Sequence, residues 1–337
     1  MPDTILLTGG AGFIGSHICV ELAKAGHRPV VLDNLCNSKP GVMERVGRII
    51  GTPVDFVQGD IRDGDLLRRT LRDFGVRSVI HLAGLKAVGE SLSRPLAYYD
   101  NNVVGTLRLL EAMESCDVRS IVFSSSATVY GVPKTLPIDE SHPLSTTNPY
   151  GQTKLVIEGM LRELRQADDR WRICLLRYFN PVGAHESGTI GEDPHGMPNN
   201  LMPFVLKVAS GRVQALSVWG GDYPTPDGTG VRDYIHVVDL AIGHVRALER
   251  LDTMACDAIN LGTGHGTSVL ELVKAFERVN GVRVPFVMKE RRSGDVSSCF
   301  ADATLAGERL GWRAQRGLDD MCRDAWHWRQ FADRHGL

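Results

Sequence analysis

The chain has 337 residues, of which 43% are hydrophobic and 23% charged, so it is long enough for two domains and too apolar for a disordered protein. Its 38 basic and 40 acidic residues leave a formal charge of −2, which argues against the broad positive field that nucleic acid or an anionic membrane attracts. We therefore expect a small-molecule ligand, and no nucleic-acid or membrane partner.

The sequence has no clear signal for a membrane span, for secretion or for disulfide bonds. No apolar run approaches the roughly 20 residues needed to cross a bilayer, and the first residues lack the basic segment of a secretory signal, so we expect a cytoplasmic protein. The seven cysteines are scattered without a C-x-x-C pair. This spacing predicts free thiols, with neither disulfides nor a metal site.

Apolar runs of strand length alternate with helical stretches through the first half of the chain. The predicted strands are, in order, Thr4–Leu7, Pro29–Leu32, Val54–Gln58, Ser78–Leu82, Ser120–Ser124 and Arg172–Arg177. The predicted helices between them are Gly15–Ala25, Asp65–Phe74, Asn101–Ser115 and Tyr150–Gln166. This alternation predicts the α/β class, with a doubly wound parallel Rossmann sheet covered by helices on both faces.

The composition changes after Asn180-Pro181. Stretches rich in Gly, Pro, Asn and Asp run to about residue 203 and again over 220–230. We expect residues 1–180 to form the Rossmann domain and residues 181–337 a smaller α/β substrate domain. Part of 233–280 again has the pattern of regular secondary structure, and could pack back on the first domain.

A glycine-rich turn follows the first predicted strand and opens the first helix. It reads Thr8-Gly9-Gly10-Ala11-Gly12-Phe13-Ile14-Gly15 and contains G-x-G-x-x-G. Glycines at this place allow a tight turn and let backbone N–H groups approach a pyrophosphate at the helix N-terminus. The second strand leads to Asp33, at about the 20-residue distance where an acid binds a ribose 2′-hydroxyl. The sequence therefore predicts NAD rather than NADP as cofactor.

Two more segments follow strand ends at the same edge of the predicted sheet. Asp60 comes after the third strand, and His81-Leu82-Ala83-Gly84 comes after the fourth. Asp60 is a candidate for binding the adenine, and the alternative is a helix cap or turn residue.

A serine cluster and a Tyr/Lys pair form the candidate catalytic set. The fifth strand ends in Ser124-Ser125-Ser126, and the next helix begins with Tyr150 and Lys154 four residues apart, which places both on one helix face. A lysine ammonium near the phenol, and a positive nicotinamide, would each lower the tyrosine pKa from its ordinary value of about 10 toward that of a useful base. A surface pair is the ordinary explanation of Y-x-x-x-K alone. The upstream glycine turn and the serine cluster favour catalysis.

From Thr8 to about Trp312 the chain resembles the extended short-chain dehydrogenase/reductase superfamily, and within it the UDP-galactose 4-epimerases. The similar blocks are Asp33–Ser38, His81–Ser91, Tyr98–Asn102, Arg177–Ala184, Asp222–Thr225 and Gly228–His236. The resemblance implies reversible C4 inversion between UDP-glucose and UDP-galactose, through a transient 4-keto sugar and tightly bound NAD, in a homodimer.

The resemblance also implies roles for individual residues. Tyr150 would be the base, Ser126 would hydrogen-bond the reacting oxygen, and Lys154 would hold the nicotinamide ribose. The cofactor-binding set would be Gly9, Gly12, Phe13, Ile14, Gly15, Asp33, Asn34, Asp60, Ile61, Leu82, Ala83, Gly84, Lys86, Asn101 and Tyr178. The substrate-binding set would be Phe179, Asn180, Asn200, Leu201, Trp219, Arg232, Arg292, Asp295 and Cys299. For Arg232 and Arg292 a surface salt bridge is the alternative.

The sequence leaves the sugar substrate and the reaction open between several alternatives. Cys299 falls where family members of narrower substrate specificity carry a bulky tyrosine. Because a small residue enlarges the pocket, it predicts that UDP-N-acetylglucosamine and UDP-N-acetylgalactosamine are also interconverted. The alternative is that Cys299 is a buried packing thiol. Ala127 and Thr128 stand where nucleotide-sugar 4,6-dehydratases carry an acidic pair, which argues against that chemistry. A 4-epimerase of UDP-linked uronic acids or pentoses, a free-standing alcohol dehydrogenase and a non-catalytic NAD-binding protein remain as alternatives.

Overall fold

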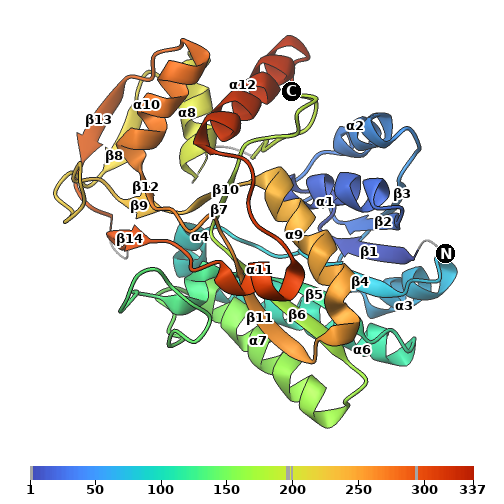
Figure 1. The fold of residues 1–337 in the computed structure, drawn as a ribbon. Helices are drawn as coiled ribbons and strands as arrows, with labels where there is room; N and C mark the ends of the chain where they lie inside the picture. The colour runs from blue at the N-terminus through green and yellow to red at the C-terminus, as the bar shows by residue number, and fades with distance from the viewer. Residues whose placement is uncertain (1–2, 195–197, 199, 293–294) are drawn as a thin grey trace.

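A computed structural model describes residues 3–194, 198, 200–292 and 295–337 of the chain (Figure 1). Its centre is a seven-stranded sheet in the order β11-β6-β5-β4-β1-β2-β3, and all neighbouring strands are parallel. The strands are β1 (Thr4–Thr8), β2 (Arg28–Asp33), β3 (Asp55–Gln58), β4 (Ser78–His81), β5 (Ser120–Ser126), β6 (Arg172–Tyr178) and β11 (Cys256–Leu261). The predicted doubly wound parallel sheet is confirmed.

Alternating side chains of the strands form a separate core on each face of the sheet. In β1, Ile5 and Leu7 belong to one buried cluster, and Leu6 between them belongs to the other. The first cluster is covered by α1 (Phe13–Lys24), α2 (Gly41–Ile50), α9 (Val237–Arg250) and α11 (Thr304–Leu310). The second is covered by α3 (Gly64–Asp73), α6 (Gly105–Ser115) and α7 (Pro149–Ala167). The near-continuous apolar runs of the sequence follow from this burial on both faces.

Several boundaries differ from the expected ones. The six predicted strands and three of the predicted helices are present with ends moved by one or two residues. The predicted helix Asn101–Ser115 is continuous with a wider, π-helical turn, η1 (Tyr99–Val104), that precedes α6. Helix α2 was not predicted, because glycines at 41, 47 and 51 made its sequence resemble a loop.

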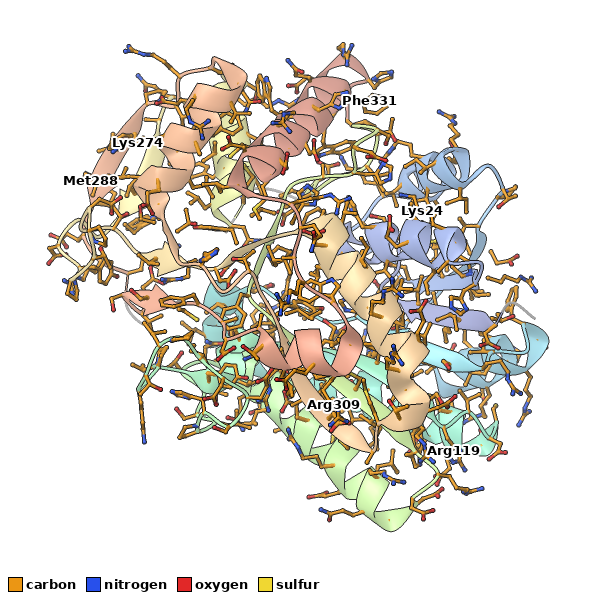
Figure 2. All side chains as sticks on the ribbon, in the orientation of Figure 1. Lys24, Arg119, Lys274, Met288, Arg309 and Phe331 are labelled. Atoms are coloured by element: carbon orange, nitrogen blue, oxygen red, sulfur yellow. The ribbon has the colours of Figure 1, made fainter. Side chains whose placement is uncertain are left out.

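The remaining elements stand beside the carboxyl ends of the strands (Figure 1). Helices α8 (Leu201–Ala209), α10 (Val269–Asn280) and α12 (Leu318–Arg334) share a third buried cluster. Three small sheets complete this part: β8 (Leu216–Trp219) with β13 (Phe286–Lys289), β7 (Asn180–Val182) with β10 (Tyr234–His236), and β12 (Thr267–Ser268), β9 (Val231–Arg232) and β14 (Ser298–Cys299). Figure 2 draws the side chains in the same view and labels Lys274 on α10, Met288 on β13 and Phe331 on α12 among these elements.

Short helical segments connect the elements of the large sheet. They are α4 (Val88–Ser93), α5 (Pro95–Tyr98), η2 (Ala127–Tyr130) and η3 (Leu251–Thr253). Within the described ranges, no helix combines the length and apolarity that a membrane span requires. All seven cysteines have free thiols.

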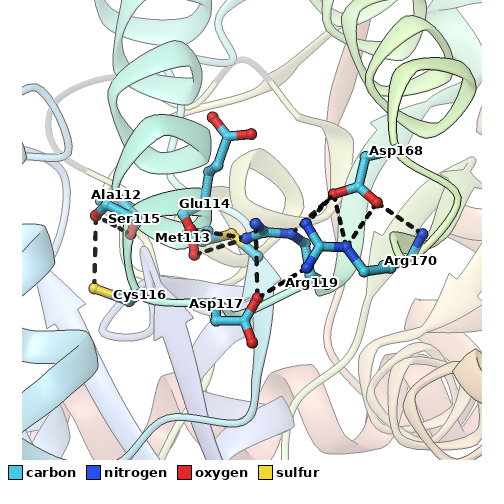
Figure 3. Close-up of polar contacts among 9 residues, drawn as sticks. All are labelled: Ala112, Met113, Glu114, Ser115, Cys116, Asp117, Arg119, Asp168 and Arg170. Carbon is cyan, nitrogen blue, oxygen red and sulfur yellow. Dashed lines mark hydrogen bonds and ion pairs between the residues drawn. The ribbon is translucent and has the colours of Figure 1, made fainter.

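An ion-pair cluster ties the far end of α7 to the sheet, away from the carboxyl ends of the strands (Figure 3). Arg119, just before β5, lies 3.3 Å from Asp168, which follows α7, and 3.7 Å from Asp117. Arg170 pairs with Asp168 at 2.8 Å and with Asp117 at 3.6 Å. The last turn of α7 is therefore fixed to the amino end of β5.

Candidate functional site

A cavity of about 900 Å³ opens at the carboxyl ends of the sheet strands, between the sheet and the C-terminal elements. In an open parallel sheet, ligands bind at this edge, where the strand order reverses, which here is between β1 and β4. With one exception, Asp60, every residue predicted to belong to the site lines this cavity. They are Gly9, Gly12, Phe13, Ile14, Gly15, Asp33, Asn34, Ile61, Leu82, Ala83, Gly84, Lys86, Asn101, Ser126, Tyr150, Lys154, Tyr178, Phe179, Asn180, Asn200, Leu201, Trp219, Arg232, Arg292, Asp295 and Cys299.

The glycine turn has the shape that a dinucleotide needs. Gly9 has a φ of 72°, and a Cβ there would lie 2.7 Å from the backbone nitrogen of Ala83. A Cβ at Gly15 would lie 2.5 Å from the carbonyl oxygen of Gly9. Gly12 is the N-cap of α1 and makes no side-chain cap, so the first N–H groups of this helix are left for an anion. These residues fit the pyrophosphate of NAD.

Asp33 is the last residue of β2, and its side chain contacts the glycine turn. It is 8% exposed, and its Oδ2 accepts a hydrogen bond from the Ala11 backbone N–H at 3.1 Å. Its Oδ1 accepts from the Leu35 N–H at 2.8 Å and from the Ser38 hydroxyl at 3.1 Å. These contacts fix the carboxylate at the cavity wall, and its bond to a ribose hydroxyl stays a prediction.

Asp60 lies outside the cavity lining, although its neighbours Gly59 and Ile61 both contribute to it. Its carboxylate pairs with Arg62 at 2.8 Å and accepts a hydrogen bond from the Asn34 amide at 3.0 Å. Hydrogen bonds from Arg62 hold the pKa of Asp60 well below its usual range. These contacts are those expected of a turn residue, which was the alternative for Asp60. A role for Asp60 in adenine binding stays a prediction.

The Ser/Tyr/Lys set meets where β5 ends and α7 begins. Helix α7 starts there because the Asn148 side chain caps it, accepting the Gly151 N–H at 2.9 Å, and because Pro149 occupies the first turn. Ser126 is the last residue of β5, and its Oγ accepts the hydroxyl of Thr128 at 3.0 Å. The apolar surroundings of Tyr150 raise the pKa of its phenol, whereas a hydrogen bond with Ser126 lowers it.

Lys154 is held against β5. Its side chain is buried, its Nζ donates to the Ser124 carbonyl oxygen at 2.6 Å, and it lies 4.8 Å from the centre of the Phe123 ring. Burial lowers the pKa of Lys154 to about 8, against a raising contribution from Glu158. The lysine contacts the strand end, so its direct effect on the Tyr150 phenol stays a prediction.

Tyr178 closes the same end of the sheet. Its hydroxyl is hydrogen-bonded to the hydroxyl of Ser124, and burial raises its pKa. An ionised phenol is therefore disfavoured at Tyr178, as it is at Tyr150, whose pKa burial also raises, so the choice of Tyr150 as the base stays a prediction.

The opposite wall of the cavity comes from the C-terminal elements. Arg232 stands on β9, and its guanidinium donates to the Val231 carbonyl at 2.8 Å. Arg292 pairs with Asp295 at 2.9 Å and lies 5.9 Å from the centre of the Trp219 ring. The ion pair expected as the alternative for Arg292 is thus present, but both partners line the cavity. An exposed pair of this kind is weak, so the guanidinium remains available to a phosphate.

Cys299, on β14, is partly buried beside Phe179 and Ala301. Burial raises the pKa of its thiol to about 11, so the side chain is a small neutral group at neutral pH. Cys299 both lines the cavity and packs against buried side chains. Its position is therefore compatible with a residue that enlarges the pocket and with a packing thiol.

Several lining residues were not predicted. Glu192 accepts hydrogen bonds from Lys86 at 3.3 Å and from Asn200 at 3.2 Å, and Asp193 pairs with Lys39 at 2.6 Å. Glu192 and Asp193 belong to the Gly- and Pro-rich stretch, where no spacing marks a functional residue. Only the fold brings these two side chains to the cavity wall.

The chain is similar to known proteins over nearly its whole length. Residues 5–262 match the NAD dependent epimerase/dehydratase family. The UDP-glucose 4-epimerase of Bacillus subtilis is 59% identical over 325 residues, which are 96% of each chain. The crystal structure of UDP-glucose-4-epimerase from Stenotrophomonas maltophila, with bound NAD and formylated UDP-arabinopyranose, has a TM-score of 0.97 at 52% identity and covers 99% of both chains. That of the Bifidobacterium longum UDP-glucose 4-epimerase, in complex with NAD⁺ and UDP, has a TM-score of 0.96 at 52% identity and covers 99% of this chain and 100% of the other.

Proposed function

The chain belongs to the NAD dependent epimerase/dehydratase family, and from that premise we propose that it is a UDP-glucose 4-epimerase that interconverts UDP-glucose and UDP-galactose. The observation that carries the proposal is one cavity that joins the glycine turn to Ser126, Tyr150 and Lys154. The uronic-acid, pentose, dehydrogenase and non-catalytic alternatives are not favoured, because the relatives reported above are UDP-glucose 4-epimerases.

NAD is the proposed resident cofactor, and when bound it supplies reversible hydride transfer at C4 of the sugar. The N-terminus of α1 at Gly12 would hold its pyrophosphate, Asp33 would bind the adenosine ribose, and Lys86 would lie beside its phosphates. The cavity wall formed by the C-terminal elements would keep the cofactor in place between the two halves of the reaction.

Tyr150 is the proposed base. It removes the proton of the 4-hydroxyl as the C4–H bond breaks, which gives a 4-keto sugar, and returns the proton when the opposite face is reduced. Ser126 donates a hydrogen bond to the reacting oxygen, and Lys154 provides the positive charge that favours the phenolate. The second face becomes accessible when the keto sugar turns about its diphosphate.

The substrate is held mainly through UDP. Arg232 and Arg292 offer permanent charge and forked donors that suit a diphosphate, and Asn200 and Leu201 begin α8 at the same wall. Binding energy concentrated on the nucleotide leaves the sugar free to turn inside the cavity. Cys299 leaves room for a larger substituent, so we include UDP-N-acetylglucosamine and UDP-N-acetylgalactosamine among the proposed substrates.

The proposal includes a homodimer. Five apolar side chains lie on the surface of α4, α5, η1 and α6: Leu92 and Leu96 are 62% and 82% exposed, and Val88, Val104 and Leu107 are 41%, 37% and 41% exposed. Exposed apolar clusters mark interaction surfaces, and a second copy of the chain would cover this one. Leu96→Asp should shift the mass measured by light scattering from dimer to monomer, and an unchanged mass would remove this surface from the interface.

Two further assignments complete the proposal. Residues 1–180 form the NAD-binding domain and 181–337 the UDP-sugar-binding domain, with α9 and β11 of the second part packed on the first. The seven free thiols suit a reducing compartment, so we assign the enzyme to the cytoplasm.

One assay tests the function. Purified protein, given UDP-galactose without added NAD, should form UDP-glucose and should show no net change in nicotinamide absorbance. Tyr150→Phe should reduce kcat by about 10²–10⁴-fold while UDP still binds, because only the proton acceptor is lost. Activity that survives this substitution would remove Tyr150 as the base, and a parent enzyme without activity on UDP-galactose would overturn the function.

A further inference from the structure

A buried ion pair lies beside the proposed catalytic lysine. Arg177 on β6 and Glu158 on α7 have side chains only 2% and 0% exposed. The guanidinium binds the carboxylate through two hydrogen bonds, Nη2 to Oε2 at 2.6 Å and Nε to Oε1 at 2.9 Å. Burying both charges is costly, and such a pair contributes little stability beyond what apolar residues would give.

The carboxylate of Glu158 has two more donors. The Ser125 hydroxyl donates to its Oε1 at 2.6 Å, and Arg162 donates to its Oε2 at 2.9 Å from the partly exposed side of α7. Burial opposes ionisation of Glu158, but the hydrogen bonds and charge of Arg177 outweigh it and lower the pKa of Glu158. Glu158 is therefore a fixed negative charge at neutral pH.

Each member of this network is next to a proposed site residue. Ser125 precedes Ser126 on β5, and Arg177 precedes Tyr178 on β6. Glu158 follows Lys154 by four residues on α7, and so lies on the same helix face, one turn further from the cavity. The network thus cross-links the three elements that carry the proposed chemistry.

The charge environment of Lys154 is simple. From β5 it meets the Ser124 carbonyl and the Phe123 ring, and on its own helix, α7, the charge of Glu158 acts on it from one turn away. From β4 it faces His81, which is neutral because burial lowers its pKa to about 3. Glu158 is faced in turn by Arg177, Arg162, Ser125 and, from β11, Cys256. Burial disfavours the ammonium of Lys154, and Glu158 is the carboxylate that opposes this effect.

We propose that Glu158 is a positioning residue for the proposed Tyr150/Lys154 pair, which locks α7 to the strand ends through Arg177 and Ser125 and keeps Lys154 charged. This role of Glu158 rests on the proposed epimerase function only where enzyme activity is measured. Glu158 acts through Lys154 and does not touch the reacting atoms.

The direct test is Glu158→Gln, which keeps the shape and removes the charge. The titration of the Lys154 amine is followed by NMR, its signal assigned by its loss in Lys154→Met. We expect its pKa to fall by about one unit relative to the parent. The alkaline limb of the kcat–pH profile should move to lower pH by the same amount, with KM changed less than kcat.

Matched variants separate this effect from loss of stability. Arg119→Gln weakens the ion-pair cluster at the other end of α7 (Figure 3). It should lower the melting temperature without moving the Lys154 titration or the kcat–pH profile. Glu158→Asp keeps the charge and should restore most of the parental profile. If Glu158→Gln does not fold, the neutral pair Glu158→Gln/Arg177→Gln replaces it, and the Lys154 titration should shift in the same direction.

The outcomes are distinct. A folded Glu158→Gln or double variant with the parental Lys154 titration overturns the inference, whatever its activity. A parent enzyme without epimerase activity would overturn the proposed function, and the NMR titration would still decide the role of Glu158.

Discussion

Gly15 offers a sharp test of the glycine turn, because two opposing effects can be compared there. It lies inside α1, where alanine is favoured over glycine by about 1 kcal/mol. A Cβ at this position would lie 2.5 Å from the Gly9 carbonyl oxygen and 2.6 Å from the Gly10 Cα, and neither backbone atom can move aside as a side chain could. Overpacking of this kind costs about 1–3 kcal/mol, and it also pushes the turn out of the shape that receives the pyrophosphate.

We therefore predict that Gly15→Ala lowers the free energy of unfolding by up to about 2 kcal/mol, because the clash with backbone atoms outweighs the gain in helix propensity. The variant should also carry less NAD after purification. The assay is urea unfolding of each protein, combined with the amount of nucleotide released on denaturation.

Gly307 in α11 is the matched control. A Cβ there would lie 3.4 Å from its nearest neighbour, the flexible Arg313 side chain, which is ordinary contact. Gly307→Ala should raise the free energy of unfolding by about 0.5–1 kcal/mol and leave the NAD content unchanged. If Gly15→Ala matches the parent in stability and NAD content, the close approach in the turn does not have the role assigned to it.

Three further predictions follow from the site and its surroundings. Arg292→Gln should weaken UDP binding about tenfold, measured by calorimetry, because it removes a charged donor at an exposed position, and unchanged affinity would place Arg292 outside the diphosphate site. Cys299→Tyr should abolish turnover of the N-acetylated sugars while UDP-galactose is still converted, and equal loss on both substrate pairs would argue for a packing role. His17 and His81 are buried, and burial lowers the pKa of each to about 3, so the unfolded chain binds more protons than the folded one between pH 6.5 and about 3. The free energy of unfolding should fall as the pH drops through this window and His17→Gln should flatten the fall, whereas a slope unaffected by the substitution would exclude His17 as a cause.

The sequence predicted the sheet well because its strands are buried on both faces and therefore appear as apolar runs. It did not predict α2, a helix that contains Gly41 and Gly47 and is stabilised by packing Val42, Met43 and Val46 against the core. The last sheet strand, β11, pairs with β6 about 80 residues earlier, a partner that no local pattern encodes.

Residues in motifs were easier to find than residues brought together by folding. The glycine turn and Tyr150/Lys154 have fixed local spacing, so their neighbours in sequence are also their neighbours in space. Glu192 lies 106 residues after Lys86 in the sequence, so only the fold brings these two side chains together. Glu158 and Arg177 are ordinary surface residue types in sequence, and only their complete burial marks them as a functional pair.

The central claim is that hydride leaves C4 and returns to C4 within one cavity, and retention of an isotope label tests it most directly. UDP-galactose deuterated at C4 is converted in ordinary water, and the UDP-glucose formed is analysed by NMR. The account predicts that deuterium stays at C4 of the product, with none in the solvent. Loss of the label to water would contradict it, because inversion would then proceed by proton exchange rather than by hydride return.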